Sequence, residues 1–198
     1  MTPGPAALPP RRRTVRRLAI GLPLALAIVP PLLLVRAMVR DTVDFPWMDQ
    51  WTFAREVVHV HDGQFAAREL WVQHNEHRVP VAKLVLHALA AVSGWDVRWE
   101  VGANLVVALT MIVLVASIIR RTVGPVAPMA LGVLVLAASA LQSSLVQWQN
   151  WTWGWQLGLL LAEAGAVVVA VVLERAASAP ARWAAVAMLA AVAAALSN

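Results

Sequence analysis

Long apolar runs, separated by short polar stretches, dominate this chain. The longest runs cover residues 18–39, 101–119, 127–146, 155–173 and 183–196. About 20 mainly apolar residues form a helix that crosses a bilayer. The pattern therefore predicts an all-α polytopic transmembrane helical bundle of about five spans. Residues 40–100 are its long first loop, which we expect to be extracytoplasmic and to contain short interfacial helices.

A shorter apolar run, VPVAKLVLHALAAV at residues 79–92, interrupts that loop and contains Lys83 and His87. Its length suits an interfacial, re-entrant or protein-buried helix better than a full span. Positively charged loops tend to remain in the cytoplasm. Leaving this helix out of the membrane puts the most basic segments on that side, namely residues 1–17, Arg120, Arg121, Arg175 and Arg182. We therefore predict a cytoplasmic N-terminus at residues 1–17, a single transmembrane domain at residues 18–198, and an outer face for residues 40–100 and 147–155.

Composition agrees with a membrane protein, because 60% of the residues are hydrophobic and only 14% are charged. The net charge of +5 arises from basic residues beside the apolar runs, which favours lipid headgroups over nucleic acid as their partners. The absence of cysteine excludes a disulfide framework, a thiolate nucleophile and a thiolate metal site. Nine of the eleven acidic residues and all five histidines lie at positions 41–100, so the first loop holds most of the titratable chemistry.

The early part of this loop, DFPWMDQWTFAREVVHVHDG, has the signals of a surface helix. Asp44 or Asp49 can cap its first turn, and Gly63 can end it. Asp49 has two interpretations. It is a helix cap, or it is a carboxylate just above the bilayer that takes a proton from an acceptor hydroxyl or binds a phosphate-carrying cation.

The later stretch WVQHNEHRVP contains His74 and His77 on either side of Glu76. If the stretch is helical, the two histidines share a face and could bind a divalent cation, with Glu76 completing the site. The spacing differs from the H-E-x-x-H pattern of metalloproteases. A metal-dependent membrane hydrolase is a hypothesis that follows from this interpretation.

Two other interpretations of the same stretch remain open. Asn75 or Glu76 caps the helix that Pro80 introduces, and Arg78 and Lys83 then bind a lipid-linked phosphate near its N-terminus. Alternatively, the stretch is a polar cluster that stabilises the loop through hydrogen bonds.

Tryptophan is concentrated beside the two outer loops, where nine of the ten lie. An aromatic belt at the level of the headgroups explains this distribution. Stacking of indole rings on sugar rings is the alternative explanation, and composition alone does not separate the two. In the second loop, VQWQNWTWGWQ, the glutamines could hydrogen-bond a substrate or satisfy helix ends.

The order of these parts resembles bacterial members of the GT-C glycosyltransferase superfamily. The resemblance covers residues 18–198 and depends mainly on HNEHR in the first loop and NWTWGWQ in the second. Members of the superfamily take a sugar from a polyprenyl-phosphate carrier on the outer face of the membrane. The resemblance implies a transferase in the bacterial cytoplasmic membrane that acts on a polyprenyl-phosphate-sugar donor and a cell-envelope acceptor.

The resemblance also implies roles for particular residues. Asp49 matches the catalytic base best, with Asp44 second. Residues of the first loop would orient the acceptor, hold a divalent cation or stabilise the leaving phosphate, and residues of both loops would bind substrate: His74, Glu76, His77, Arg78, Lys83, Trp151, Trp153 and Gln156.

Members of the superfamily have many more spans than this chain. We therefore expect residues 1–198 to be the N-terminal part of a longer protein, or to need a partner membrane subunit for activity. The alternative function is a non-catalytic membrane protein that binds lipid-linked glycan or assembles with such a partner.

Overall fold

A computed structural model describes residues 21–123, 127–175 and 180–197. Its elements are α2 (Val29–Asp41), α3 (Gln50–His61), η1 (Ala67–Trp71), α4 (Pro80–Ser93), α5 (Arg98–Thr122), α6 (Pro128–Gln142), η2 (Leu145–Gln147), α7 (Trp148–Thr152), η3 (Gly154–Gln156), α8 (Leu157–Arg175) and α9 (Pro180–Ala195). Every element in these ranges is helical, so the prediction of an all-α bundle is confirmed. The basic segment at residues 1–17 lies outside the described residues.

Four helical stretches are long and apolar enough to cross a membrane: Gly21–Asp41, Arg98–Thr122, Met129–Thr152 and Gly154–Arg175. In the most apolar part of each, only 17% to 28% of the residues are buried inside the protein. Apolar surface of this extent is stable in lipid rather than in water. The chain is therefore a multi-pass membrane protein.

The fifth expected span, residues 183–196, falls on α9, which has 16 residues and is shorter than the four spanning stretches. It packs along α8, where Gly165 allows the two backbones to approach closely. A Cβ atom at Gly165 would lie 2.4 Å from the Cβ of Ala194.

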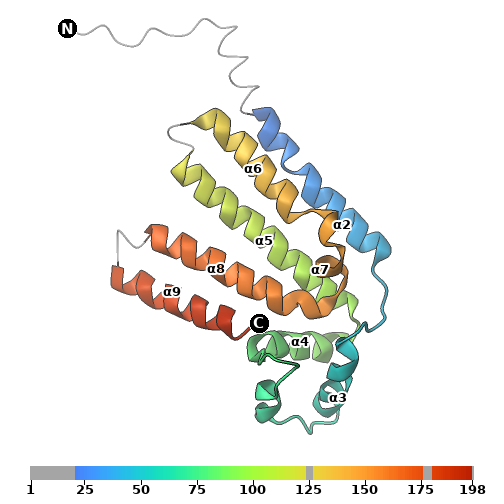
Figure 1. Ribbon diagram of the computed structural model, residues 1–198. Coiled ribbons are helices and arrows are strands. Elements are labelled where there is room, and N and C mark those ends of the chain that lie inside the picture. The colour runs from blue at the N-terminus through green and yellow to red at the C-terminus, as the bar shows by residue number, and fades with distance from the viewer. Residues whose placement is uncertain (1–20, 124–126, 176–179, 198) are drawn as a thin grey trace, which may run out of the picture.

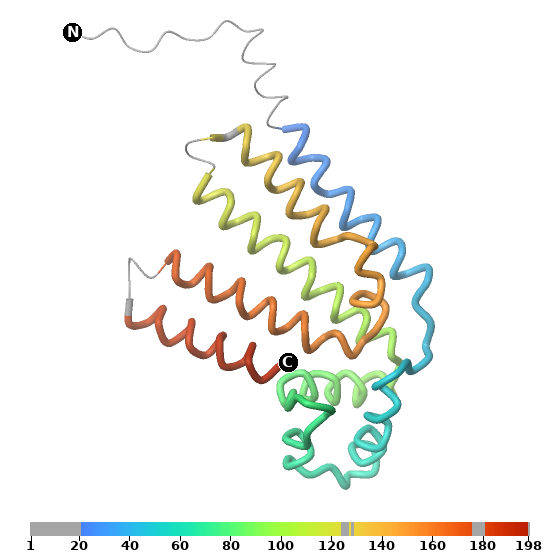
Figure 2. The backbone as a smooth tube through the Cα atoms, viewed as in Figure 1, coloured from blue at the N-terminus to red at the C-terminus, as the bar shows by residue number. Residues whose placement is uncertain are grey.

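The long helices lie side by side, with α5 between α6 and α8, α2 next to α6, and α9 on the outer side of α8 (Figures 1 and 2). The main core lies where α2, α5, α7 and α8 meet. It contains Leu34, Met38, Val101, Ala108, Met111, Trp151 and Leu160.

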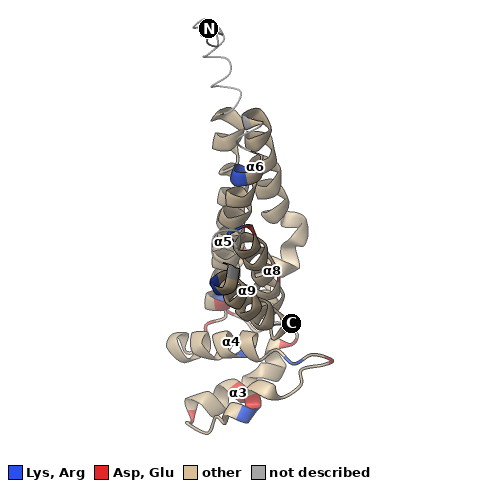
Figure 3. Cartoon of the chain, turned by 90° about the vertical axis from the view of Figure 1, so that its left-hand side faces the viewer, with Lys and Arg blue, Asp and Glu red and all other residues tan. Residues whose placement is uncertain are grey.

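The expected short helix at residues 79–92 is present as α4, which crosses one end of the long helices beside α3 (Figure 1). The amide of Val81 in its first turn donates to the carbonyl of Leu196 at 3.1 Å. This bond satisfies one of the free donors that every helix start leaves. Gly94, with φ of 66°, ends the helix in the left-handed conformation. The acidic residues gather at this end of the molecule, around α3 and α4 (Figure 3).

Candidate functional site

Asp49 lies at the start of α3, as the sequence predicts, but its side chain makes no capping hydrogen bond to a described residue. The preceding residue, Met48, has φ of 48°, a left-handed conformation that is uncommon for residues other than glycine. The Asp49 carboxylate instead approaches His74, with 3.4 Å between Oδ2 and Nε2. The side chain of Asp49 is 35% exposed and that of His74 is 15% exposed, so solvent reaches the carboxylate more easily than the imidazole.

His74 belongs to a tight turn rather than to a helix. The amides and carbonyls of His74 and His77 bond to each other in both directions, at 2.8 and 3.0 Å, and Asn75 has φ of 49°. The helical metal-site interpretation of His74 and His77 is therefore wrong in its geometry. Across residues 21–123, 127–175 and 180–197, no three histidine or acidic side chains are grouped to hold a metal ion.

The capping interpretation of this turn is also wrong. The N-cap of α4 is Val79, and no side chain in the described part of the chain caps it. Glu76, His77 and Arg78 are exposed, and their side chains have no hydrogen-bond or ion-pair partner among the described residues. These three side chains are therefore available to a ligand at the edge of the site.

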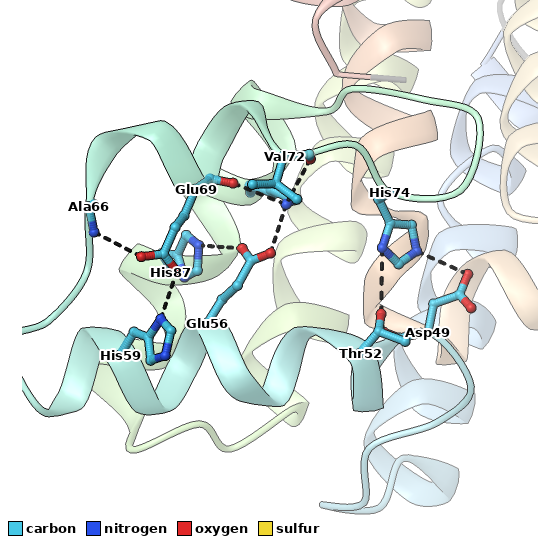
Figure 4. A network of polar contacts seen from close by, with 10 residues as sticks. Asp49, Thr52, Glu56, His59, Ala66, Glu69, Val72, His74 and His87 are labelled. Carbon is cyan, nitrogen blue, oxygen red and sulfur yellow. Dashed lines mark hydrogen bonds and ion pairs between the residues drawn. The ribbon is translucent and has the colours of Figure 1, made fainter.

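The imidazole of His74 connects α3 to η3, the short helix that precedes α8. Its Nδ1 lies 3.5 Å from the Thr52 hydroxyl, and its ring packs on Trp155 with 4.2 Å between the ring centres. The Thr52 hydroxyl donates to the Asp49 carbonyl at 2.7 Å, which leaves its lone pairs for an N–H of His74. Figure 4 shows His74 between Thr52 and Asp49. These contacts hold the imidazole beside the carboxylate, and Nε2 of His74 makes no hydrogen bond to a described residue.

Lys83 is not available to a substrate phosphate, contrary to the sequence interpretation. It is 1% exposed, and its ammonium donates to Glu56 Oε1 at 2.8 Å and to the carbonyls of Glu69 and Val72 at 3.2 and 3.1 Å. An ammonium has three hydrogens, so these bonds use all of them. Lys83 therefore stabilises the loop.

Glu56 is the acceptor that sequence reasoning missed. Its second oxygen lies 3.1 Å from Nε2 of His87 (Figure 4). Burial favours the neutral form of Glu56, but hydrogen bonds from His87 and Lys83, together with their positive charge, outweigh burial and lower its pKa. The sequence spacing could have indicated these contacts. Asp49, Thr52 and Glu56 follow an i, i+3, i+7 pattern, and Lys83 and His87 are four residues apart, so each set lies on one face of a helix.

A second carboxylate extends this network toward η1. Glu69 accepts from the amide of Ala66 at 3.0 Å, and its other oxygen lies 2.8 Å from Nδ1 of His59. The Ala66 amide is the largest influence on the carboxyl of Glu69, and His59 adds to it, so the pKa of Glu69 is lowered. Glu56, Glu69, Lys83 and His87 thus form a polar cluster that joins α3, η1 and α4. None of these four residues belongs to WVQHNEHRVP, the stretch for which the sequence suggested such a cluster.

Asp44, the second candidate for the base, has a structural contact instead. Its Oδ1 accepts from the amide of Val97 at 3.0 Å, at the N-cap of α5. The structure therefore brings Asp49, but not Asp44, to the histidine of the HNEHR motif.

The second loop contributes a different tryptophan from those expected. Trp151 is 1% exposed, packs in the main core and donates from Nε1 to the Ser144 carbonyl at 3.0 Å, so it is not a sugar platform. Trp153 and Gln156 are partly buried and remain candidates. Trp155, which sequence reasoning did not select, is the residue that contacts His74.

Asn104 on α5 holds this loop in place. It is fully buried, and its amide donates to the carbonyls of Asn150 and Trp153 at 3.3 and 3.0 Å. Gly154 is required in the same region, because a Cβ atom there would lie 2.2 Å from a carboxylate oxygen of Glu100. The loop geometry therefore depends on residues of α5.

No family model, curated protein or solved structure matches this chain. The resemblance to glycosyltransferases thus depends on the order of the segments and on the motifs HNEHR and NWTWGWQ.

Proposed function

We propose that this protein is an integral membrane glycosyltransferase, similar to the GT-C superfamily, with Asp49 as the catalytic base. The observation that carries the proposal is the contact between Asp49 and His74. It places a partly exposed carboxylate beside an imidazole, at the end of a membrane-embedded bundle. Such a carboxylate can remove a proton from a hydroxyl group in the transition state.

The proposed reaction transfers a sugar from a polyprenyl-phosphate carrier to a hydroxyl of a cell-envelope acceptor. Asp49 takes the hydroxyl proton while the acceptor oxygen bonds to the anomeric carbon. The bond from that carbon to the phosphate oxygen breaks, and its electrons leave with polyprenyl phosphate. His74 acts as a positioning residue, because Thr52 and Trp155 fix its ring against the carboxylate.

Exposed side chains in and just after the turn suit binding of the leaving phosphate. Arg78 and His77 lie within four residues of His74 and are unpaired in the described part of the chain. A guanidinium binds phosphate through paired hydrogen bonds and stabilises the negative charge that develops there. We propose Arg78 as the main contact of the leaving phosphate, and a divalent cation held with substrate oxygens is compatible with this arrangement.

A groove between α4, α5 and α8 suits the carrier lipid. It has a volume of about 730 Å³ and is lined mainly by apolar side chains, including Val85, Leu89, Val106 and Leu161. Trp99 and the ion-paired Asp96 and Arg98 also line it. A polyprenyl chain fits such a surface, because it exchanges one apolar environment for another.

Transfer by purified protein in liposomes tests the proposal. The donors are radiolabelled polyprenyl-phosphate hexoses and pentoses, and the acceptors are cell-envelope glycans. Asp49→Asn should lower the transfer rate at least about 100-fold, the usual contribution of a general base. Asp62→Asn is the matched control, since Asp62 is an exposed carboxylate at the other end of α3. Unchanged transfer by Asp49→Asn would overturn the assignment of the base.

The second candidate is a non-catalytic protein that binds lipid-linked glycan or assembles with a partner subunit. The lipid-sized groove favours it, because binding there needs no catalytic carboxylate. It predicts retention of the labelled donor by the protein without turnover, and equal retention by Asp49→Asn.

A further inference from the structure

A hollow of about 300 Å³ lies where the end of α2, the loop before α3, the start of α5 and α7 meet. We call it the aromatic hollow, because its lining includes Phe45, Trp47, Trp148 and Trp153. Met48 and Gln50, the two neighbours of Asp49, also line it. The aromatic hollow is therefore next in sequence to the proposed base, although the Asp49 carboxylate contacts His74.

The rim and the floor of the aromatic hollow differ in character. Trp47 and Trp148 at the rim are 57% and 40% exposed, whereas Gln50 in the floor is 2% exposed. The amide of Gln50 is fixed, because it accepts from the Trp47 amide at 2.8 Å and donates to Glu100 at 2.5 Å. Flat, accessible indole rings above a fixed floor form a surface on which the apolar face of a pyranose ring can stack.

Two buried polar atoms on lining residues lack a partner. The Thr42 hydroxyl and Nε1 of Trp153 make no hydrogen bond to a described residue. Both atoms are covered by protein atoms, so they belong to the wall of the aromatic hollow and are not exposed to a ligand in it.

The charge of the lining residues indicates which class of sugar the aromatic hollow can bind. Among the described residues that line the aromatic hollow, Asp41 alone is charged, and it is exposed. An anionic sugar or a sugar phosphate would meet the Asp41 carboxylate. Arg40 lies 3.6 Å from that carboxylate but is not among the lining residues, so the lining itself offers no cation to an anionic sugar. We propose that the aromatic hollow binds a neutral pyranose of the acceptor glycan, at a site separate from the one that holds the donor phosphate. The assignment to the acceptor rests on the proposed function, whereas the binding itself does not.

Binding of simple glycosides tests this inference without any transfer reaction. The protein is placed in phospholipid nanodiscs, because glucoside and maltoside detergents would compete for the site. The probes are methyl β-glucopyranoside, methyl α-mannopyranoside and, as the anionic match, methyl β-glucuronide. Saturation-transfer NMR and tryptophan fluorescence measure the dissociation constants. We expect saturable binding of at least one neutral probe and at least about tenfold weaker binding of the glucuronide.

Variants of the rim tryptophans test whether the neutral sugar binds in the aromatic hollow. Trp47→Ala and Trp148→Ala should weaken binding of the neutral probe by about tenfold, as expected when a stacked aromatic ring is lost. Both side chains are exposed at the rim, so the fold should be retained. Trp71→Ala is the matched control, because Trp71 is 53% exposed and is not among the lining residues. Its binding should equal that of the unaltered protein.

The outcomes test the neutral-sugar site and the proposed catalytic base separately. Absence of saturable binding, equal binding of the glucuronide, or unchanged binding in both rim variants would overturn the aromatic hollow as a neutral-sugar site. Asp49→Asn should bind the probe normally. If this variant also transfers sugar normally, the proposed base is wrong while the sugar site stands.

Discussion

Trp151 shows how a residue that resembles a ligand platform can instead be part of the core. Its indole is 1% exposed and packs against residues from α2, α5 and α8. Trp151→Ala should lower the free energy of unfolding by about 3–5 kcal/mol, because it removes a large buried side chain and leaves a cavity. Thermal unfolding of the purified protein measures this loss. Trp71→Ala, which removes an exposed indole, should change stability little, and equal losses in the two variants would contradict the core assignment.

Residue types alone could not distinguish side chains that bind a ligand from side chains that pack or pair inside the protein. The sequence predicted Asp49 and His74 as site residues, and the structure brings their side chains together. The sequence predicts phosphate binding by Lys83 because this residue lies near the start of the helix that Pro80 introduces, yet its partner, Glu56, lies 27 residues away in sequence. Contacts over such a separation depend on how α3 and α4 pack, and no local pattern specifies that packing.

The pairing of α3 with α4 depends on a buried ion pair whose two halves should be interdependent. Lys83→Met removes the ammonium and leaves the buried Glu56 with His87 as its remaining side-chain partner, which should cost about 3–5 kcal/mol of stability. The double variant Lys83→Met, Glu56→Leu removes both charges and should be more stable than the single variant. Unfolding temperatures in the same detergent compare the two. A double variant less stable than Lys83→Met would show that the ion pair does not behave as a unit.

The same helices should separate in acid. The folded-state pKa of Glu56 lies below its ordinary value of 4.5, so its ionised form stabilises the folded protein above that pH. This stabilisation should disappear as pH falls from about 4.5 through the lowered pKa. Glu56→Gln should therefore lose less stability than the unaltered protein when unfolding is followed from pH 6 to pH 3. Glu69 shifts in the same direction, so part of the acid loss should remain.

A control separates this effect from general acid sensitivity. Glu76 is exposed and unpaired among the described residues, so Glu76→Gln should retain the pH profile of the unaltered protein. If both variants flatten the profile equally, the buried pair is not its cause.

The whole molecule was more predictable than its site. Apolar runs of the required length are a property of local sequence, and each of the four spanning stretches overlaps an expected span. The segment that contains α3, α4 and the turn between them was only partly predictable. The length and punctuation of α3 and α4 are local features, whereas the tight turn at residues 74–77 depends on paired backbone bonds and a left-handed Asn75.

The orientation of the bundle can be tested directly, because the protein contains no cysteine and each introduced thiol is the only one present. If residues 40–100 lie outside and α4 does not cross the membrane, Asp62→Cys and Gln149→Cys should react with an impermeant maleimide added to intact cells. Ser93→Cys should react as well, since Ser93 ends α4 and would then lie on the same side of the membrane as Asp62. Arg121→Cys and Glu174→Cys should react only after the membrane is permeabilised.

Labelling of Asp62→Cys but not of Ser93→Cys in intact cells would mean that α4 crosses the membrane. In that case Arg121 would face outward, and the site around Asp49 would lie on the opposite side of the bilayer from the second loop.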